Sequence, residues 1–293
     1  MDAELLGYTF ALMAGLFFGL SDALVRAAAV RLKPMQNLLI SLLVGSPLLW
    51  IVAVSRGPPV MTMKALLLYV IAGLLNFVIG RLLFYYSITY TGATTASIVT
   101  SPTVIVSALL AWILLGEELS LLQLLGIILV VLAVYLVSHT PSGEALHGGK
   151  TSIGILAGLA STVVFAMTAV LVRSASGYMN ADPIYGVAIS YTSAIPIVVL
   201  LNKGIPDPRS LPRKHFYYMT LAAVVVAFAQ LSRYYALHLV TVAGAAVIIS
   251  LFPFFTLLFT LALSHELKEK PQVIHLLASV LAVVGIILVN YIG

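Results

Sequence analysis

The chain has 293 residues, of which 61% are hydrophobic and only 9% are charged, and its formal net charge is +5. About a quarter of the residues in a soluble domain are charged, so this composition excludes a water-soluble fold and indicates a multi-pass protein of the cell membrane. Cysteine is absent, which excludes disulfides and thiolate metal sites. The basic residues are scattered over short loops, so nucleic acid is not an expected partner.

Apolar windows of membrane-spanning length follow one another along the chain. A helix needs about 20 apolar residues to cross a bilayer. The first residues, MDAELL, are acidic where a cleavable signal needs positive charge, so the first window is expected to remain as a span. We predict an all-α membrane protein with ten transmembrane helices, at approximately residues 5–26, 35–54, 65–86, 93–115, 121–138, 153–173, 184–201, 216–237, 243–263 and 273–291.

Matching landmarks indicate a duplication. The Tyr-Tyr pair at 85–86 returns at 234–235, Pro102 returns as Pro253, and FGLSDALVR at 18–26 matches FAMTAVLVR at 165–173. We predict a first five-helix repeat over residues 1–139, a linker over 140–151 and a second five-helix repeat over 152–293. Because each repeat has an odd number of spans, the two should cross the membrane in opposite senses, as inverted repeats do.

Two arginines lie late in apolar windows, each ahead of a tyrosine pair, with Arg233 somewhat nearer to its helix end than Arg81. A charged side chain in the membrane costs roughly 2.5 to 3.5 kcal/mol and therefore faces protein or water. We predict that Arg81 and Arg233 bind the carboxylate or phosphate of a substrate and approach it from opposite membrane faces. The alternative is a guanidinium satisfied by backbone carbonyls or extended to the interface.

Asp22 lies one helical turn before Arg26, and the sequence leaves two interpretations of it open. The spacing allows an internal ion pair between the two side chains. Alternatively, Asp22 is a coupling site whose buried carboxyl takes up a proton in competition with substrate. The equivalent position of the second repeat is Ala169, so such a proton site would be asymmetric.

Four further polar residues near the arginines complete the predicted substrate-binding set. Tyr85 and Tyr234 offer flat amphipathic surfaces, although tyrosine also serves as an interfacial or packing residue. Asn76 and Gln230 can act as cavity donors or as interhelical hydrogen-bonding groups. If the arginines are engaged elsewhere, the tyrosines can enclose a cationic amine instead.

Both copies of the fourth window contain a proline. Proline removes a backbone hydrogen bond and kinks a membrane helix, and neighbouring hydroxyl groups can satisfy the freed carbonyls. We predict a gate or cavity bend formed by Thr100, Ser101 and Pro102 in the first repeat and by Ser250 and Pro253 in the second; a static kink is the alternative.

FFGLSDALVR and the stretch from Tyr90 through Pro102 to AWILLGEELSLLQLLG resemble the EamA transporters of the drug/metabolite transporter superfamily, and the resemblance spans nearly the whole chain. It implies ten helices in two repeats and a secondary transporter that moves small metabolites, often outward, through a central cavity by alternating access. Two positions depart from the family pattern. The corner of the second half reads SHEL, with His265 in place of glutamate, and Asp22 lies in a segment that is normally uncharged.

We expect a secondary transporter that exports amino acids or other small, partly anionic compounds. A proton-coupled exporter of cationic amphiphiles is the alternative within transport, and a membrane-embedded scaffold or lipid-modifying enzyme is the alternative of another class. The six histidines are dispersed, and there is no phosphate-cradling loop for ATP. We therefore predict no catalytic residue, cofactor or metal. The expected partners are the lipid bilayer, a small-molecule substrate and a coupling proton, and the chain is expected to be a monomer or homodimer.

The membrane orientation receives two conflicting predictions. Ten spans place both termini on one side, and most basic loop residues fall on the other side. The positive-inside rule therefore predicts that both termini lie outside the cell. The EamA resemblance implies termini in the cytoplasm, and this is the placement that we expect.

Overall fold

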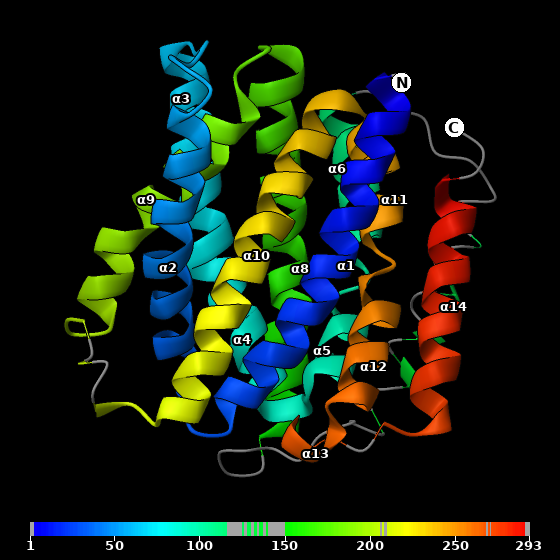
Figure 1. The fold of residues 1–293 in the computed structure, drawn as a ribbon. Helices are drawn as coiled ribbons and strands as arrows, with labels where there is room; N and C mark the ends of the chain where they lie inside the picture. The colour runs from blue at the N-terminus through cyan, green and yellow to red at the C-terminus, as the bar shows by residue number, and fades with distance from the viewer. Residues whose placement is uncertain are drawn as a thin grey trace.

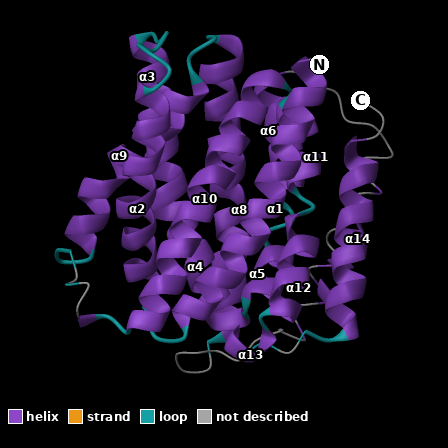
Figure 2. Cartoon of the chain, in the orientation of Figure 1, coloured by secondary structure: helices purple, strands orange, loops and turns teal. Residues whose placement is uncertain are grey.

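The computed structural model describes residues 3–115, 150–205, 207, 210–267, 269 and 271–290, together with positions 125, 128–129, 132–133, 135–136 and 139. Helices joined by short turns make up the described part of the chain (Figure 2). They are α1 (Ala3–Ala29), α2 (Pro34–Val54), α3 (Met63–Gly73), η1 (Leu74–Arg81), α4 (Leu82–Thr91), α5 (Ala93–Val99), α6 (Thr103–Leu115), α8 (Thr151–Arg173), η2 (Ser174–Tyr178), α9 (Pro183–Leu201), α10 (Arg213–Leu239), α11 (Val242–Ile249), α12 (Phe252–Ala262), α13 (Ser264–Leu267) and α14 (Val273–Asn290).

Within the described residues, six continuous helices are long and apolar enough to cross a membrane: Ala3–Ala29, Pro34–Val54, Met63–Thr91, Thr151–Tyr178, Pro183–Leu201 and Arg213–Leu239. Shorter apolar helices occupy the fourth, ninth and tenth predicted windows, at Ala93–Ser107, Phe252–Ala262 and Val273–Gly285. The fold is therefore the all-α membrane fold expected from composition. The predicted fifth window and the linker lie almost entirely outside the described residues.

The two repeats run in opposite senses through the bundle. Near its start, α1 lies against the end of α10, where Gly7 meets Val240, and near its end Arg26 reaches the end of α4. For α8 the order is reversed, because Gly154 near its start meets Tyr90 of α4, while Arg173 at its end reaches the end of α10. The first helices of the repeats are thus antiparallel, which is visible for α1 and α8 in Figure 1.

The repeats also interlock. The first helix of each repeat packs against the third and fourth spans of the other, since α1 lies on α10 and α12 while α8 lies on α4 and α6. Helix α2 packs against its counterpart α9. The main apolar core, which includes Leu38, Tyr69, Phe84, Tyr191 and Tyr234, accordingly draws side chains from both halves. Each half buries its apolar surface on the other, so the duplication in sequence builds one common bundle.

Turn chemistry fixes where several helices begin. Asp182 caps α9 by accepting hydrogen bonds from the backbone N–H groups of Ile184 (2.8 Å) and Tyr185 (3.3 Å), and Pro183 follows as the first helical residue. Thr241 caps α11 in the same manner, through the N–H of Gly244. Between α4 and α5 the chain reverses at Gly92, whose φ of +94° favours glycine because a Cβ would be strained there.

An arginine at the end of the first helix of each repeat binds the end of the third span. Arg26 donates from Nη1 to the carbonyls of Ile88 and Thr89 (3.0 and 2.9 Å). Arg173 donates from Nη1 to the carbonyls of Leu237 and His238 (3.0 and 2.9 Å). The last carbonyls of a helix lack intrahelical partners, so each arginine satisfies groups that would otherwise be unpaired.

Arg26 also forms a fully buried ion pair with Glu269, with 3.4 Å between Nε and Oε1. The carboxylate of Glu269 accepts hydrogen bonds from the backbone N–H groups of Ala93 and Thr94 at the start of α5. Of the two interpretations of Asp22, the ion pair with Arg26 is therefore wrong. Arg26 turns toward the helix ends and Glu269, and neither carboxylate oxygen of Asp22 has a hydrogen-bond partner.

Candidate functional site

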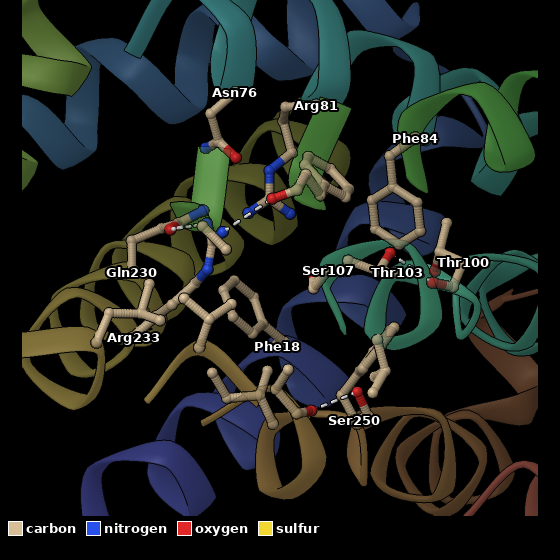
Figure 3. Close-up of a pocket in the computed structure, with 18 of the residues that line it drawn as sticks. Phe18, Asn76, Arg81, Phe84, Thr100, Thr103, Ser107, Gln230, Arg233 and Ser250 are labelled. Carbon is tan, nitrogen blue, oxygen red and sulfur yellow. Dashed lines mark hydrogen bonds between the residues drawn. The ribbon is translucent and has the colours of Figure 1, made fainter. Parts of the chain in front are cut away.

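A cavity lies at the centre of the bundle, between the two repeats, with about 720 Å³ of empty space among its lining atoms. Its walls come from α1, η1, α4, the break after α5, α6, α8, α10, α11 and α12, so both repeats contribute (Figure 3). Among the described residues, three charged side chains line it: Asp22, Arg81 and Arg233.

The π-helix η1 places two of the polar lining residues. Hydrogen bonds from residue i to i+5 widen the helix, and such segments are frequent at functional sites. Asn76 and Arg81 are five positions apart within η1, and both side chains border the cavity. The side-chain nitrogen and oxygen of Asn76 are buried without a hydrogen-bond partner. This segment therefore presents one cation and one free amide to the same space.

Arg81 is surrounded by aromatic rings. Its guanidinium carbon lies 5.5 Å from the ring centre of Phe18, 5.7 Å from that of Tyr85 and 6.0 Å from that of Phe165. Across the described part of the chain, Arg81 has no hydrogen bond and no ion pair, although it is only 4% exposed. Rings stabilise a cation modestly, and its five N–H donors remain available to an anion or water.

Arg233 enters the same cavity from α10 and is partly satisfied by protein. It donates from Nη1 to Oε1 of Gln230 (3.4 Å) and from Nη2 to the carbonyl of Phe165 (3.3 Å), as the dashed lines of Figure 3 show. Both hydrogen bonds are long for a charged donor. The two arginines converge on Phe165, one over its ring and the other at its carbonyl, so they share one cavity wall.

The arginines are not copies of each other. The tyrosine pairs are related by a shift of 149 positions, and the same shift pairs Arg81 with Gln230 and Phe84 with Arg233. All four residues line the cavity, as do the matched pairs Phe18 and Phe165 and Asp22 and Ala169. Each charge therefore belongs to one repeat only. The cavity is thus lined by equivalent positions of the two repeats, but the charged residues at these positions differ between the repeats.

Asp22 is fully buried among these groups. Both of its carboxylate oxygens lack a hydrogen-bond partner, and Arg81 is the cation whose field acts on it. Tyr85 is the other titratable group within electrostatic reach. No ion pair joins Asp22 to Arg81. The cavity thus holds a carboxylate and a guanidinium that face a common space without contacting each other.

The helix breaks in the fourth and ninth spans border the cavity as well. Helix α5 ends at Val99 and α6 begins at Thr103, while α11 ends at Ile249 and α12 begins at Phe252. The predicted kinks are therefore full interruptions, each marked by its proline. Thr100 and Ser250 line the cavity from these breaks, whereas Ser101, Pro102 and Pro253 are not part of the lining.

Of the predicted substrate-binding set, Asn76, Arg81, Gln230 and Arg233 meet in the cavity. Tyr85 and Tyr234 lie behind its wall. The ring of Tyr85 packs on Arg81, and the Tyr234 hydroxyl donates to Oγ of Ser190 (3.0 Å). A tyrosine in an apolar helix can point inward or sideways, and sequence spacing alone does not distinguish the two.

Several residues that line the cavity were not predicted as site residues from the sequence. Phe18 and Phe165 were used only as landmarks of the repeat, yet their shared place at the start of the matched segments is a signal for a common wall. Thr103 and Ser107 follow Pro102 on the cavity side of α6. Glu269 was also assigned no role from the sequence, and it does not line the cavity but pairs with Arg26. The shift of 151 that relates the prolines pairs Glu269 with Glu118, which lies outside the described residues.

The comparisons with known proteins agree with this architecture. The model of the EamA-like transporter family matches residues 5–139 and 152–291. No curated protein matches the chain significantly. A solved structure titled "Crystal structure of protein" superimposes with a TM-score of 0.68 at 16% sequence identity, over 99% of this chain and 96% of the other. At that identity the likeness shows the fold alone.

Proposed function

This chain belongs to the EamA-like transporter family, and on that premise we propose that it is a secondary transporter that exports α-amino acids or closely related small carboxylates. The observation that carries the proposal is Arg81, a buried cation that borders the cavity with its hydrogen-bond donors unused. An unpaired buried charge is costly unless a partner reaches it. A substrate carboxylate would supply that partner through forked hydrogen bonds.

Asp22 supports an amino acid over a simple anion. The ammonium of an α-amino acid lies next to its carboxylate, and the cavity presents an unpaired carboxylate and an unpaired guanidinium to one space. With the carboxylate on Arg81 and the ammonium on Asp22, each buried charge gains a partner. Arg233, with its long hydrogen bonds, adds positive potential at the same wall.

Asp22 also provides a means of coupling. A proton on its carboxyl removes the negative charge that the ammonium needs, so proton and substrate bind in alternation. An inward proton gradient then drives the substrate outward, which gives export in the sense of proton antiport. The titratable and charged groups that act on Asp22 are Arg81 and Tyr85.

A cationic amphiphile fits this cavity poorly. Its lining carries two arginines and one aspartate, so a cation would enter a site of net positive charge. The tyrosines that were expected to enclose an amine lie behind the wall. The electrostatics therefore favour a substrate with an anionic group.

Counterflow in proteoliposomes tests the proposed substrate class. Vesicles preloaded with phenylalanine are offered radiolabelled phenylalanine together with an excess of phenylalanine, phenylalanine amide or 3-phenylpropanoate as competitor. We expect the amide, which lacks the carboxylate, to compete about 10-fold to 100-fold more weakly than phenylalanine, because it loses a charge-assisted hydrogen bond. Equal competition by the amide and the acid, or no phenylalanine counterflow, would contradict the proposal.

A further inference from the structure

The far side of the cavity from the arginines carries hydroxyl groups. Thr100, Thr103 and Ser107 follow one another along the break before α6 and its first turns, Ser250 lies at the separate break between α11 and α12, and Arg81 and Arg233 lie on the other side (Figure 3). The aromatic ring of Phe84 lies beside this hydroxyl cluster. The cavity therefore has a charged end and a neutral polar end.

Most hydroxyl hydrogens of this cluster are already committed. Thr103 donates to the carbonyl of Thr100 (2.7 Å), Thr100 donates to the carbonyls of Ala96 and Ser97 (3.1 and 3.0 Å), and Ser250 donates to the carbonyl of Ala246 (2.5 Å). A hydroxyl has one hydrogen and two lone pairs. These three side chains can therefore only accept a further hydrogen bond.

Ser107 differs from its neighbours. Its hydroxyl is buried, lines the cavity and has no hydrogen-bond partner, although the side chain is only 1% exposed. A buried polar group without a partner is costly, so this oxygen indicates a ligand or water that reaches it. It stands one turn after Thr103 on the same helix, so both face the same volume.

Resting on the proposed function, we infer that the transported amino acid carries a hydrogen-bond donor at the end of its side chain, which the hydroxyl oxygen of Thr103 accepts, while Ser107, whose own hydrogen is uncommitted, lies beside it and can accept or donate. The carboxylate lies at Arg81, the apolar body of the side chain passes between phenylalanine rings, and a terminal O–H or N–H donates to the hydroxyl cluster. If the substrate carries only an acceptor at that end, its lone pairs face those of the Thr103 oxygen, and no hydrogen bond forms between them.

A matched set of ligands tests this inference. Tyrosine has a terminal donor, O-methyltyrosine has only an acceptor, and phenylalanine has neither. Binding to the purified protein is measured for the wild type, Thr103→Val and Ser107→Ala, with Thr168→Val as control. The control hydroxyl is also buried and bonded to a backbone carbonyl, but Thr168 does not line the cavity.

We expect the wild type and Thr168→Val to bind tyrosine about tenfold more tightly than O-methyltyrosine. In Thr103→Val this difference should shrink toward onefold, while phenylalanine affinity stays unchanged and so reports an intact site. Ser107→Ala removes a hydroxyl that can donate to the ether oxygen of O-methyltyrosine, so it should keep or enlarge the difference. Equal wild-type affinity for tyrosine and O-methyltyrosine would overturn the inference, as would a tenfold difference that persists in Thr103→Val. If phenylalanine binds through Arg81 without any preference for tyrosine, only this inference fails and the proposed function stands.

Discussion

Arg81→Ala is expected to reduce amino-acid counterflow roughly 30-fold or more, because truncating one partner of a buried charge pair costs about 2 to 5 kcal/mol. The guanidinium borders the cavity and has no partner among the described side chains, so its loss removes the group that would hold the substrate carboxylate. Counterflow of labelled phenylalanine in proteoliposomes measures the effect. Arg56→Ala, which changes an exposed arginine, is the control.

Thermal unfolding separates this role from a structural one. An arginine that holds helices together destabilises the protein when it is removed, whereas an unpaired buried cation costs free energy in the empty protein. We therefore expect Arg81→Ala to unfold at the same temperature as the wild type or above it. Arg81→Lys keeps the positive charge but cannot form two parallel hydrogen bonds with a carboxylate. Its transport should therefore lie between that of Arg81→Ala and that of the wild type. A large drop in unfolding temperature together with normal residual transport would assign Arg81 to structure.

Asp22→Asn is expected to reverse the preference between an amino acid and its desamino analogue. At a pH at which Asp22 of the wild type is ionised, it attracts the ammonium of phenylalanine and repels the carboxylate of 3-phenylpropanoate, which has no ammonium. The neutral amide of asparagine does neither. Phenylalanine should therefore bind more weakly to Asp22→Asn than to the wild type, and 3-phenylpropanoate more tightly, each by about tenfold.

The same variant should lose coupling. Asparagine cannot take up a proton, so a pH gradient should no longer drive accumulation of phenylalanine in Asp22→Asn vesicles, while slow exchange persists. Glu4→Gln, at an exposed acid of the same helix, should behave as the wild type. Accumulation at the wild-type level by Asp22→Asn would remove Asp22 from the coupling mechanism.

The order of the spans and their interruptions could be predicted from sequence, because lipid imposes a simple rule on long apolar stretches. Arg81 and Asn76 could be placed inside the protein for the same reason, since lipid excludes a charge or a free amide. The prolines at 102 and 253 indicated where the fourth and ninth spans depart from regular helix. These inferences need only the local sequence and the solvent around it.

The partners of the charges could not be predicted in this way. Arg26 and Glu269 are 243 positions apart, and their contact depends on how α1 meets the turn between α4 and α5. The four-residue spacing of Asp22 and Arg26 suggested a local pair instead. Tertiary packing determines the partners of Arg26, because the carbonyls at the end of α4 and the carboxylate of Glu269 together offer it more partners than Asp22 alone.

The pairing of the arginines shows a second limit. Each arginine precedes a tyrosine pair, which suggested related positions approaching from opposite faces, but Arg81 precedes Tyr85 by four residues and Arg233 precedes Tyr234 by one. A difference of three residues is nearly one helical turn, which leaves both arginines on the cavity side of their helices at different heights. The π-helix at η1, which orients Arg81 and Asn76 together, has no clear signal in the sequence.

The central claim is a water-filled cavity of net positive charge, and accessibility of an introduced cysteine tests it most directly because the chain contains no cysteine of its own. Thr103→Cys places a thiol in the cavity, and Ile113→Cys places one on the exposed apolar surface of the same helix. We predict that an anionic methanethiosulfonate reagent modifies Thr103→Cys, faster than a cationic one does, and that Ile113→Cys in a bilayer reacts with neither. A Thr103→Cys thiol that stays unmodified, or that reacts faster with the cationic reagent, would contradict the account.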